Sequence, residues 1–133
     1  MQFTPYLFFG GACEEALDFY KRVIGAEVTS LMRFKEAPDP SMVQPGTADK
    51  IMHGSFKVGG TEVFVSDGRC EGKSNFAGFA LTLTAANEGE AERLFGALAN
   101  GGTVQMPLAK TFFSSRFGML ADKFGVSWMV LVQ

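Results

Sequence analysis

The sequence predicts an α+β fold built from two copies of a βαβββ unit. The first observation is an internal repeat, in which Glu15-Ala16 matches Glu90-Ala91 at an offset of 75 residues. The second is that each copy runs in the same order, from an apolar strand through an amphipathic helix and a glycine stop to further strands. One helix cannot cover both faces of a four-stranded sheet. We therefore expect two mixed sheets that join and curl, with helices outside and a concave groove inside.

Length, charge and cysteine content narrow the class of protein. The 133 residues suggest one compact domain, with a first module at about residues 1–68 and a second at about 76–133. Net charge is −2 and no Lys/Arg cluster appears, which argues against nucleic acid as a partner. No apolar run approaches the ~18–20 residues of a membrane-spanning helix. The two cysteines fit no disulfide framework and the N-terminus has no signal-peptide pattern, so we expect a cytoplasmic protein.

The first copy opens with the apolar run 3–9, a predicted strand that ends at a Gly10-Gly11 turn. Residues 13–24 predict a helix because apolar side chains recur at i, i+4 and i+7, and Gly25 supplies its stop. Three alternating or apolar runs then predict strands at 27–34, 51–58 and 61–66. The intervening stretch 35–50 carries three of the five prolines, which predicts a long loop acting as a lid, an interface arm or a disordered segment.

The second copy repeats this order. A strand is predicted at 76–83, and Asn87 with Glu90 three residues later is typical of a helix N-terminus. The helix is expected to stop at Gly101-Gly102, and a strand at 103–106 to end at Pro107. A strand within 111–121, a turn at 122–125 and a last strand at 126–132 complete the copy.

Three segments carry a resemblance to a known superfamily. They are GACEEALDFYKRVIGAEV (11–28), MHGSFKVGGTEVFVSD (52–67) and RFGMLADKFGVSWMVLV (116–132). The chain resembles the vicinal oxygen chelate superfamily, which includes glyoxalase I, bleomycin-resistance and extradiol dioxygenase proteins, and more narrowly its PhnB-like subset. The resemblance implies a glyoxalase-like fold and a homodimer. Some relatives carry a methyltransferase name, which is no evidence of methyl transfer here.

The resemblance also implies where a metal site would lie. Members that do chemistry usually hold one divalent metal through four His, Glu or Gln side chains, one from each of four strands. The matching positions in this sequence are Pro5, Val63 or Val65, Phe79 and Met129. None of these side chains suits a hard or borderline cation. We therefore expect no metal and no cofactor, and a groove lined by apolar groups.

Two polar residues remain as weak catalytic candidates. His53 is the single histidine, and it is expected either as a general base or ligand donor in the groove or as an ordinary strand histidine. Asp67 follows the strand 61–66, where it is expected to face the groove mouth or, more often for Asp-Gly, to form a turn with Gly68.

Three functions follow from these observations. The first is a metal-independent PhnB-like protein that binds a small apolar or aromatic molecule in the groove and works as a homodimer. The second is an isomerase- or lyase-like enzyme that uses His53 and Asp67, without the usual metal or with a displaced one. The third is a structural dimer module whose groove is filled by its own phenylalanines, with the loop 35–50 as an interface arm.

Overall fold

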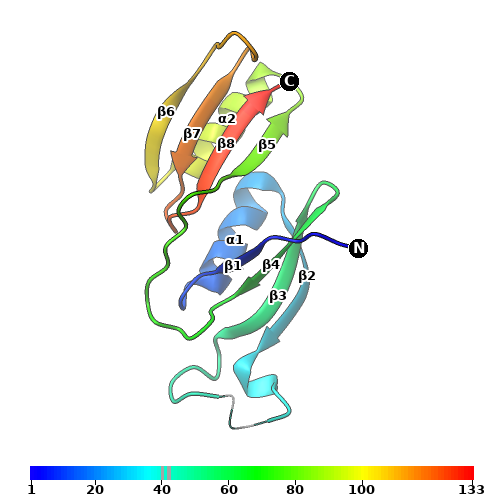
Figure 1. The fold of residues 1–133 in the computed structure, drawn as a ribbon, viewed down its shortest axis with the longest axis vertical. Helices are drawn as coiled ribbons and strands as arrows, with labels where there is room; N and C mark the ends of the chain where they lie inside the picture. The colour runs from blue at the N-terminus through cyan, green and yellow to red at the C-terminus, as the bar shows by residue number, and fades with distance from the viewer. Residues whose placement is uncertain (40, 42) are drawn as a thin grey trace. The chain divides into compact units, whose positions relative to one another are not determined.

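The computed structural model describes residues 1–39, 41 and 43–133. Within these residues, eight strands and two α-helices, with the short 3-10 helix η1, follow in the order βαβββ–βαβββ (Figure 1). The predicted α+β class and the order of each copy are confirmed. The elements are β1 (Tyr6–Phe8), α1 (Cys13–Ile24), β2 (Glu27–Arg33), η1 (Phe34–Glu36), β3 (Ile51–Val58), β4 (Thr61–Ser66), β5 (Leu81–Ala85), α2 (Glu88–Ala99), β6 (Thr103–Ala109), β7 (Phe117–Ala121) and β8 (Ser127–Val132).

The chain divides into a first unit, residues 1–74, and a second unit, residues 75–133. Each unit holds one mixed four-stranded sheet, with the order β1-β4-β3-β2 in the first and β5-β8-β7-β6 in the second. The pairs β1·β4 and β5·β8 are parallel, and the other neighbours are antiparallel. Within each unit the helix lies on one face of the sheet (Figure 1). We call the opposite face of each sheet its open face.

The first core lies between α1 and one side of its sheet. Tyr20 of α1 is fully buried, and its ring centroid lies 5.6 Å from that of Phe56 on β3. Phe56 pairs with Val63 on β4. The helix ends where Gly25 adopts the left-handed conformation (φ 68°), which glycine reaches without a Cβ clash. Burial of this apolar layer is the main force that holds α1 on the sheet.

The second core repeats this arrangement with its own helix. The side chain of Asn87 accepts a hydrogen bond from the Glu90 N–H at 2.9 Å, which confirms the predicted N-cap of α2. The strands β7 and β8 pack closely against this helix. A Cβ added to Gly118 would lie 2.6 Å from the Phe95 ring of α2, so only glycine fits there.

Several strand boundaries differ from the sequence prediction, and the first strand, predicted at 3–9, is shortened to Tyr6–Phe8. The strand predicted at 76–83 begins only at Leu81, because its partner β8 first pairs at Trp128. The strand predicted to end before Pro107 continues to Ala109. Pro107 is tolerated because β6 is an edge strand, and its pairing with β7 shifts between Met106 and Ala109.

The predicted loop 35–50 begins with η1, and its residues 40 and 42 lie outside the described part of the chain. The expected roles of this loop, as a lid, an interface arm or a disordered segment, stay predictions. Over the described ranges, neither helix combines the length and the apolar character needed to cross a membrane.

Candidate functional site

The side chains on the open face of the first sheet are not the ones that were expected to line the groove. Val63 and Val65 are buried, and Val63 pairs with Phe56, which packs against α1. Both valines therefore lie against the helix, and the expectation that they line a groove was wrong. Because side chains alternate along a strand, the open face of β4 carries Glu62, Phe64 and Ser66 instead.

Aromatic side chains gather on this open face. Tyr6 pairs with Phe64, and Phe8 pairs with Ser66. The rings of Tyr6 and Phe8 are stacked, with centroids 4.7 Å apart and planes 21° from parallel. Phe64 meets Tyr6 edge-on at 6.0 Å and His53 at 5.3 Å. We call Tyr6, Phe8, His53 and Phe64 the aromatic face.

One hydrogen bond fixes a polar point within the aromatic face. The Tyr6 hydroxyl lies 2.9 Å from Nδ1 of His53, so a residue of β1 and a residue of β3 meet across β4. Partial burial raises the pKa of the Tyr6 phenol above its usual value of 10.0. Tyr6 therefore keeps its proton at neutral pH and can donate it.

Polar groups occupy the next part of the same open face. The Thr29 hydroxyl lies 2.6 Å from that of Ser55 and donates to Glu62 at 3.4 Å. Lys57 pairs with Glu62 across β3 and β4. Lys57 lies four residues beyond His53, which is about 13 Å along a strand. Glu62 and His53 are therefore too far apart to share one cation.

The donor set does not fit a divalent metal. Glu62 is a carboxylate on the open face of β4, the strand on which the resemblance pointed to Val63 or Val65. Within the ranges 1–39, 41 and 43–133, however, no three His, Cys, Asp or Glu side chains are grouped so that they could hold a metal ion. We derive no chemical step through one.

The remaining predicted groove positions lie apart in the chain. Pro5 precedes β1, and its carbonyl accepts the Phe64 N–H at 2.9 Å, so it borders the aromatic face. Phe79 lies before β5 and is 47% exposed. Met129 lies on the open face of the second sheet, because its neighbours Trp128 and Val130 are the buried ones.

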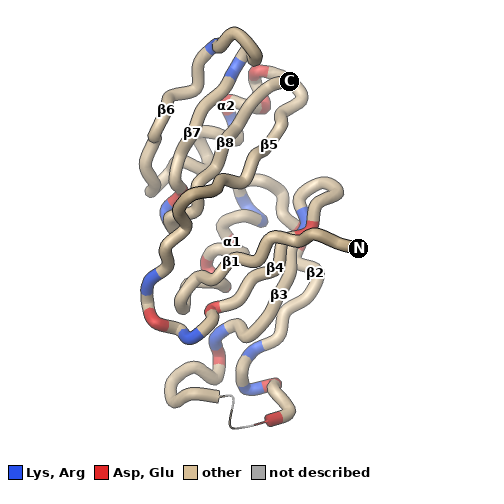
Figure 2. Tube along the Cα trace, viewed as in Figure 1, with Lys and Arg blue, Asp and Glu red and all other residues tan. Residues whose placement is uncertain are grey.

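Met129 belongs to a row of methionines on that open face. Met106 pairs with Met119, and Met119 pairs with Met129, so three thioethers follow one another across β6, β7 and β8. Thr82 of β5 ends the row. The four strands of this sheet, all of them described, contain no Lys, Arg, Asp or Glu, as Figure 2 shows. This open face is therefore uncharged, and its methionine row is apolar.

Asp67 is a structural residue of the first unit. It is 1% exposed, and its Oδ1 accepts the N–H groups of Gly11 at 2.8 Å and Cys13 at 2.9 Å. Its Oδ2 accepts the Ile51 N–H at 2.8 Å. The carboxylate faces the start of α1, whereas His53 is on the open face. The structure therefore does not bring His53 and Asp67 together.

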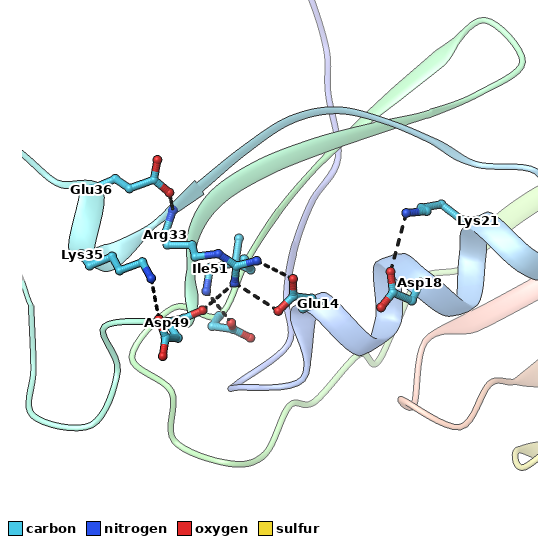
Figure 3. Close-up of polar contacts among 9 residues, drawn as sticks. Glu14, Asp18, Lys21, Arg33, Lys35, Glu36, Asp49 and Ile51 are labelled. Carbon is cyan, nitrogen blue, oxygen red and sulfur yellow. Dashed lines mark hydrogen bonds and ion pairs between the residues drawn. The ribbon is translucent and has the colours of Figure 1, made fainter.

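The surface beside α1 is charged but internally paired. Arg33 of β2 donates to the Glu14 carboxylate at 3.1 and 2.5 Å and to the Asp49 carbonyl at 2.7 Å (Figure 3). A cleft of about 470 Å³ lies by the Gly10-Gly11 turn. Two amides at this end of the helix, Gly11 and Cys13, already bind Asp67, so we do not assign a ligand site there.

Tyr6, Phe8 and Phe64 were missed as candidates by sequence reasoning. The signal was present in the alternation along 5–9, where Tyr6 and Phe8 flank the buried Leu7. It was missed because a uniformly apolar run gives no polar side to mark the open face.

Comparison with known proteins places the chain in a family. A family model described as 3-demethylubiquinone-9 3-methyltransferase matches residues 1–131. Protein YjdN of Escherichia coli K12 is 37% identical over an alignment of 142 positions, which covers 99% of this chain and 95% of YjdN.

Solved structures agree with this placement. Protein PA1353 from Pseudomonas aeruginosa is 39% identical with a TM-score of 0.88, covering 100% of this chain and 98% of that one. A PhnB protein from Bacillus cereus is 31% identical with a TM-score of 0.84, covering both chains in full. A glyoxalase/bleomycin resistance protein/dioxygenase superfamily member from Sphaerobacter thermophilus, 16% identical with a TM-score of 0.59 over 100% and 98% of the chains, shares the fold. The chain therefore belongs to the PhnB-like family described as 3-demethylubiquinone-9 3-methyltransferase, and it has the glyoxalase-like fold.

Proposed function

We propose that this PhnB-like chain binds a small aromatic molecule on its aromatic face, without help from a metal ion. One observation carries the proposal: Tyr6 and Phe8 are stacked on each other, yet they remain 40% and 53% exposed. Large rings exposed together on a folded surface mark interaction sites. A flat ligand would extend the stack and cover both rings.

The expected affinity for a simple probe is modest. An aromatic contact adds about 0.5–1.5 kcal/mol beyond the burial of its area, and association opposes it with an entropic cost. A single-ring probe such as benzamide is therefore expected to bind at about millimolar concentration. A larger natural ligand would cover more of the aromatic face and bind more tightly.

The second unit offers an apolar surface of a different kind. The row Met106, Met119 and Met129 presents unbranched thioether side chains, which adapt to ligands of varied shape. This row supports an apolar rather than a charged ligand. The methionine row does not show whether a ligand binds the second unit in preference to the first, so the proposal rests on the aromatic face alone.

Two other activities are not part of the proposal. The methyl transfer in the family's description has no support in the sequence, because no glycine-rich nucleotide motif of the G-x-G-x-x-G type follows a strand. The enzyme hypothesis that pairs His53 with Asp67 loses its geometric basis, because Asp67 is buried among backbone amides.

The predicted assembly and location remain proposals. Leu31 and Met32 on the edge strand β2, and Met106 on the edge strand β6, are each at least 40% exposed, which supports a homodimer that covers them. Light scattering on the purified chain would test this, with a monomer mass as the opposing result. A structural dimer module and a cytoplasmic location also stay predictions.

The test of ligand binding is an NMR titration with benzamide. We expect saturable shifts of the Tyr6 and Phe8 ring signals, and at least a threefold weaker dissociation constant for Tyr6→Ala/Phe8→Ala. Leu31→Ala is the matched control, because Leu31 is also 40% exposed but pairs with Gly54 on the helix side of the same sheet. Equal weakening by both variants, or no saturable binding, would refute the proposal.

A further inference from the structure

The aromatic face contains a hydrogen-bonding group with no protein partner. Nδ1 of His53 is bonded to Tyr6, whereas the described part of the chain shows no bond to Nε2. Among the described side chains, no buried nitrogen or oxygen lacks a partner. Nε2 is therefore accessible from outside, on a ring whose centroid lies 5.7 Å from that of Tyr6 and 5.3 Å from that of Phe64.

The bond to Tyr6 bears on which nitrogen of His53 carries the proton. The nearby Ser66 hydroxyl accepts the Gly68 N–H at 2.8 Å and donates to the Ile51 carbonyl at 3.5 Å. When Tyr6 donates its single phenolic proton to Nδ1 of His53, Nδ1 is the acceptor of that pair. A neutral imidazole carries one proton, which then lies on Nε2. In this tautomer His53 presents an N–H donor within an aromatic surface.

We infer that Tyr6 donates to Nδ1 of His53, that the ligand is an aromatic molecule with a carbonyl-type oxygen, and that His53 selects it by donating from Nε2 to that oxygen. This inference rests on the proposed function, because a ring must first stack on Tyr6 and Phe8. His53 acts as a specificity residue, and Tyr6 as the residue that positions its proton. The charged pair Lys57 and Glu62, on the same open face, lies about 13 Å away along β3 and β4 and does not compete for this oxygen.

The experiment compares three single-ring probes that differ only in the attached group. Benzamide offers a neutral acceptor, benzoate an anionic acceptor, and benzylamine only donors. For the wild-type chain we expect dissociation constants about three- to tenfold lower for benzamide and benzoate than for benzylamine, which is the effect of one hydrogen bond. A preference for benzoate alone would assign the selectivity to charge rather than to an acceptor oxygen, and would overturn the inference.

Two variants separate this inference from the proposed function. His53→Phe keeps a ring but removes the donor, so it should bind all three probes with similar affinity. Tyr6→Phe keeps the stack but frees Nδ1, so the preference should fall while benzylamine binding stays the same. If His53→Phe retains the preference, the inference is wrong although ring binding stands. If no probe binds any form, both proposals fail.

Discussion

The indole N–H of Trp128 donates to Oδ2 of Asp122 at 2.8 Å inside the second unit. Oδ1 of the same carboxylate accepts the N–H groups of Phe124 and Val126 at 2.9 and 3.1 Å. Asp67 has the same task in the first unit, where it accepts three backbone N–H groups. Each unit is thus organised around one buried aspartate, and neither aspartate is free for chemistry.

Replacing Asp67 with Asn should destabilise the first unit. The amide can keep one acceptor oxygen, but its NH₂ group would face the Ile51 N–H, which then loses its partner. A buried donor left without a partner costs about 1–3 kcal/mol, so the free energy of unfolding in urea should fall by that amount. The control is Asp18→Asn on the surface of α1, which should change it by less than about 0.5 kcal/mol. An unchanged unfolding midpoint for the Asp67 variant would contradict this role.

Replacing Trp128 with Phe should destabilise the second unit. Phe fills much of the buried space but cannot donate to Asp122. We expect a loss of about 1–3 kcal/mol, measured by circular dichroism during urea unfolding. The neighbouring change Met129→Leu preserves volume on the open face and should cost less than about 1.5 kcal/mol. Equal stability of wild type and the Trp128 variant would show that this bond contributes nothing.

Two glycines of the second unit should respond to alanine in opposite ways. The Cβ of an alanine at Gly118 would overlap the Phe95 ring and approach the Leu108 backbone, so over-packing should cost about 1–3 kcal/mol. An alanine at Gly96, inside α2, would meet nothing within 4 Å and should stabilise by about 0.5–1 kcal/mol. Melting temperatures that shift in the same direction would contradict the packing described for this helix.

Acid should remove the contribution of the Glu14–Arg33 pair. The hydrogen bond from Arg33 holds the pKa of the Glu14 carboxyl below its usual value of 4.5. A lowered folded-state pKa means that the stabilisation is present above the unfolded-state pKa and is lost as pH falls through the folded-state pKa. The Glu14→Gln variant should therefore melt slightly below wild type at pH 7, and the difference should shrink as the pH is lowered below 4.5. A difference that persists in acid would have another cause.

Sequence reasoning predicted the fold better than the site. The helix at 13–24 and the cap at Asn87 follow from local patterns, and both agree with the structure. The predicted face for Val63 and Val65 was wrong. It was inferred from the ligand positions of the superfamily rather than from which side of the strand would be buried. Two alternating valines beside Glu62 and Ser66 mark the helix side of a one-sided sheet.

The Tyr6–His53 contact was beyond the reach of the sequence. Its two residues are 47 positions apart, and they meet only because β1 joins β4 in parallel while β3 lies on the other side of β4. Local periodicity predicts the strands but not their order in the sheet. The same limit hid the methionine row, whose members come from three separate strands.

The most direct test of the account is a crystal structure of the chain grown with benzamide. We expect its ring to stack on Tyr6 and Phe8 and its carbonyl oxygen to lie about 3 Å from Nε2 of His53. Benzamide bound only in the cleft at the Gly10-Gly11 turn, or only on the methionine row, would contradict the assignment of the aromatic face as the binding site.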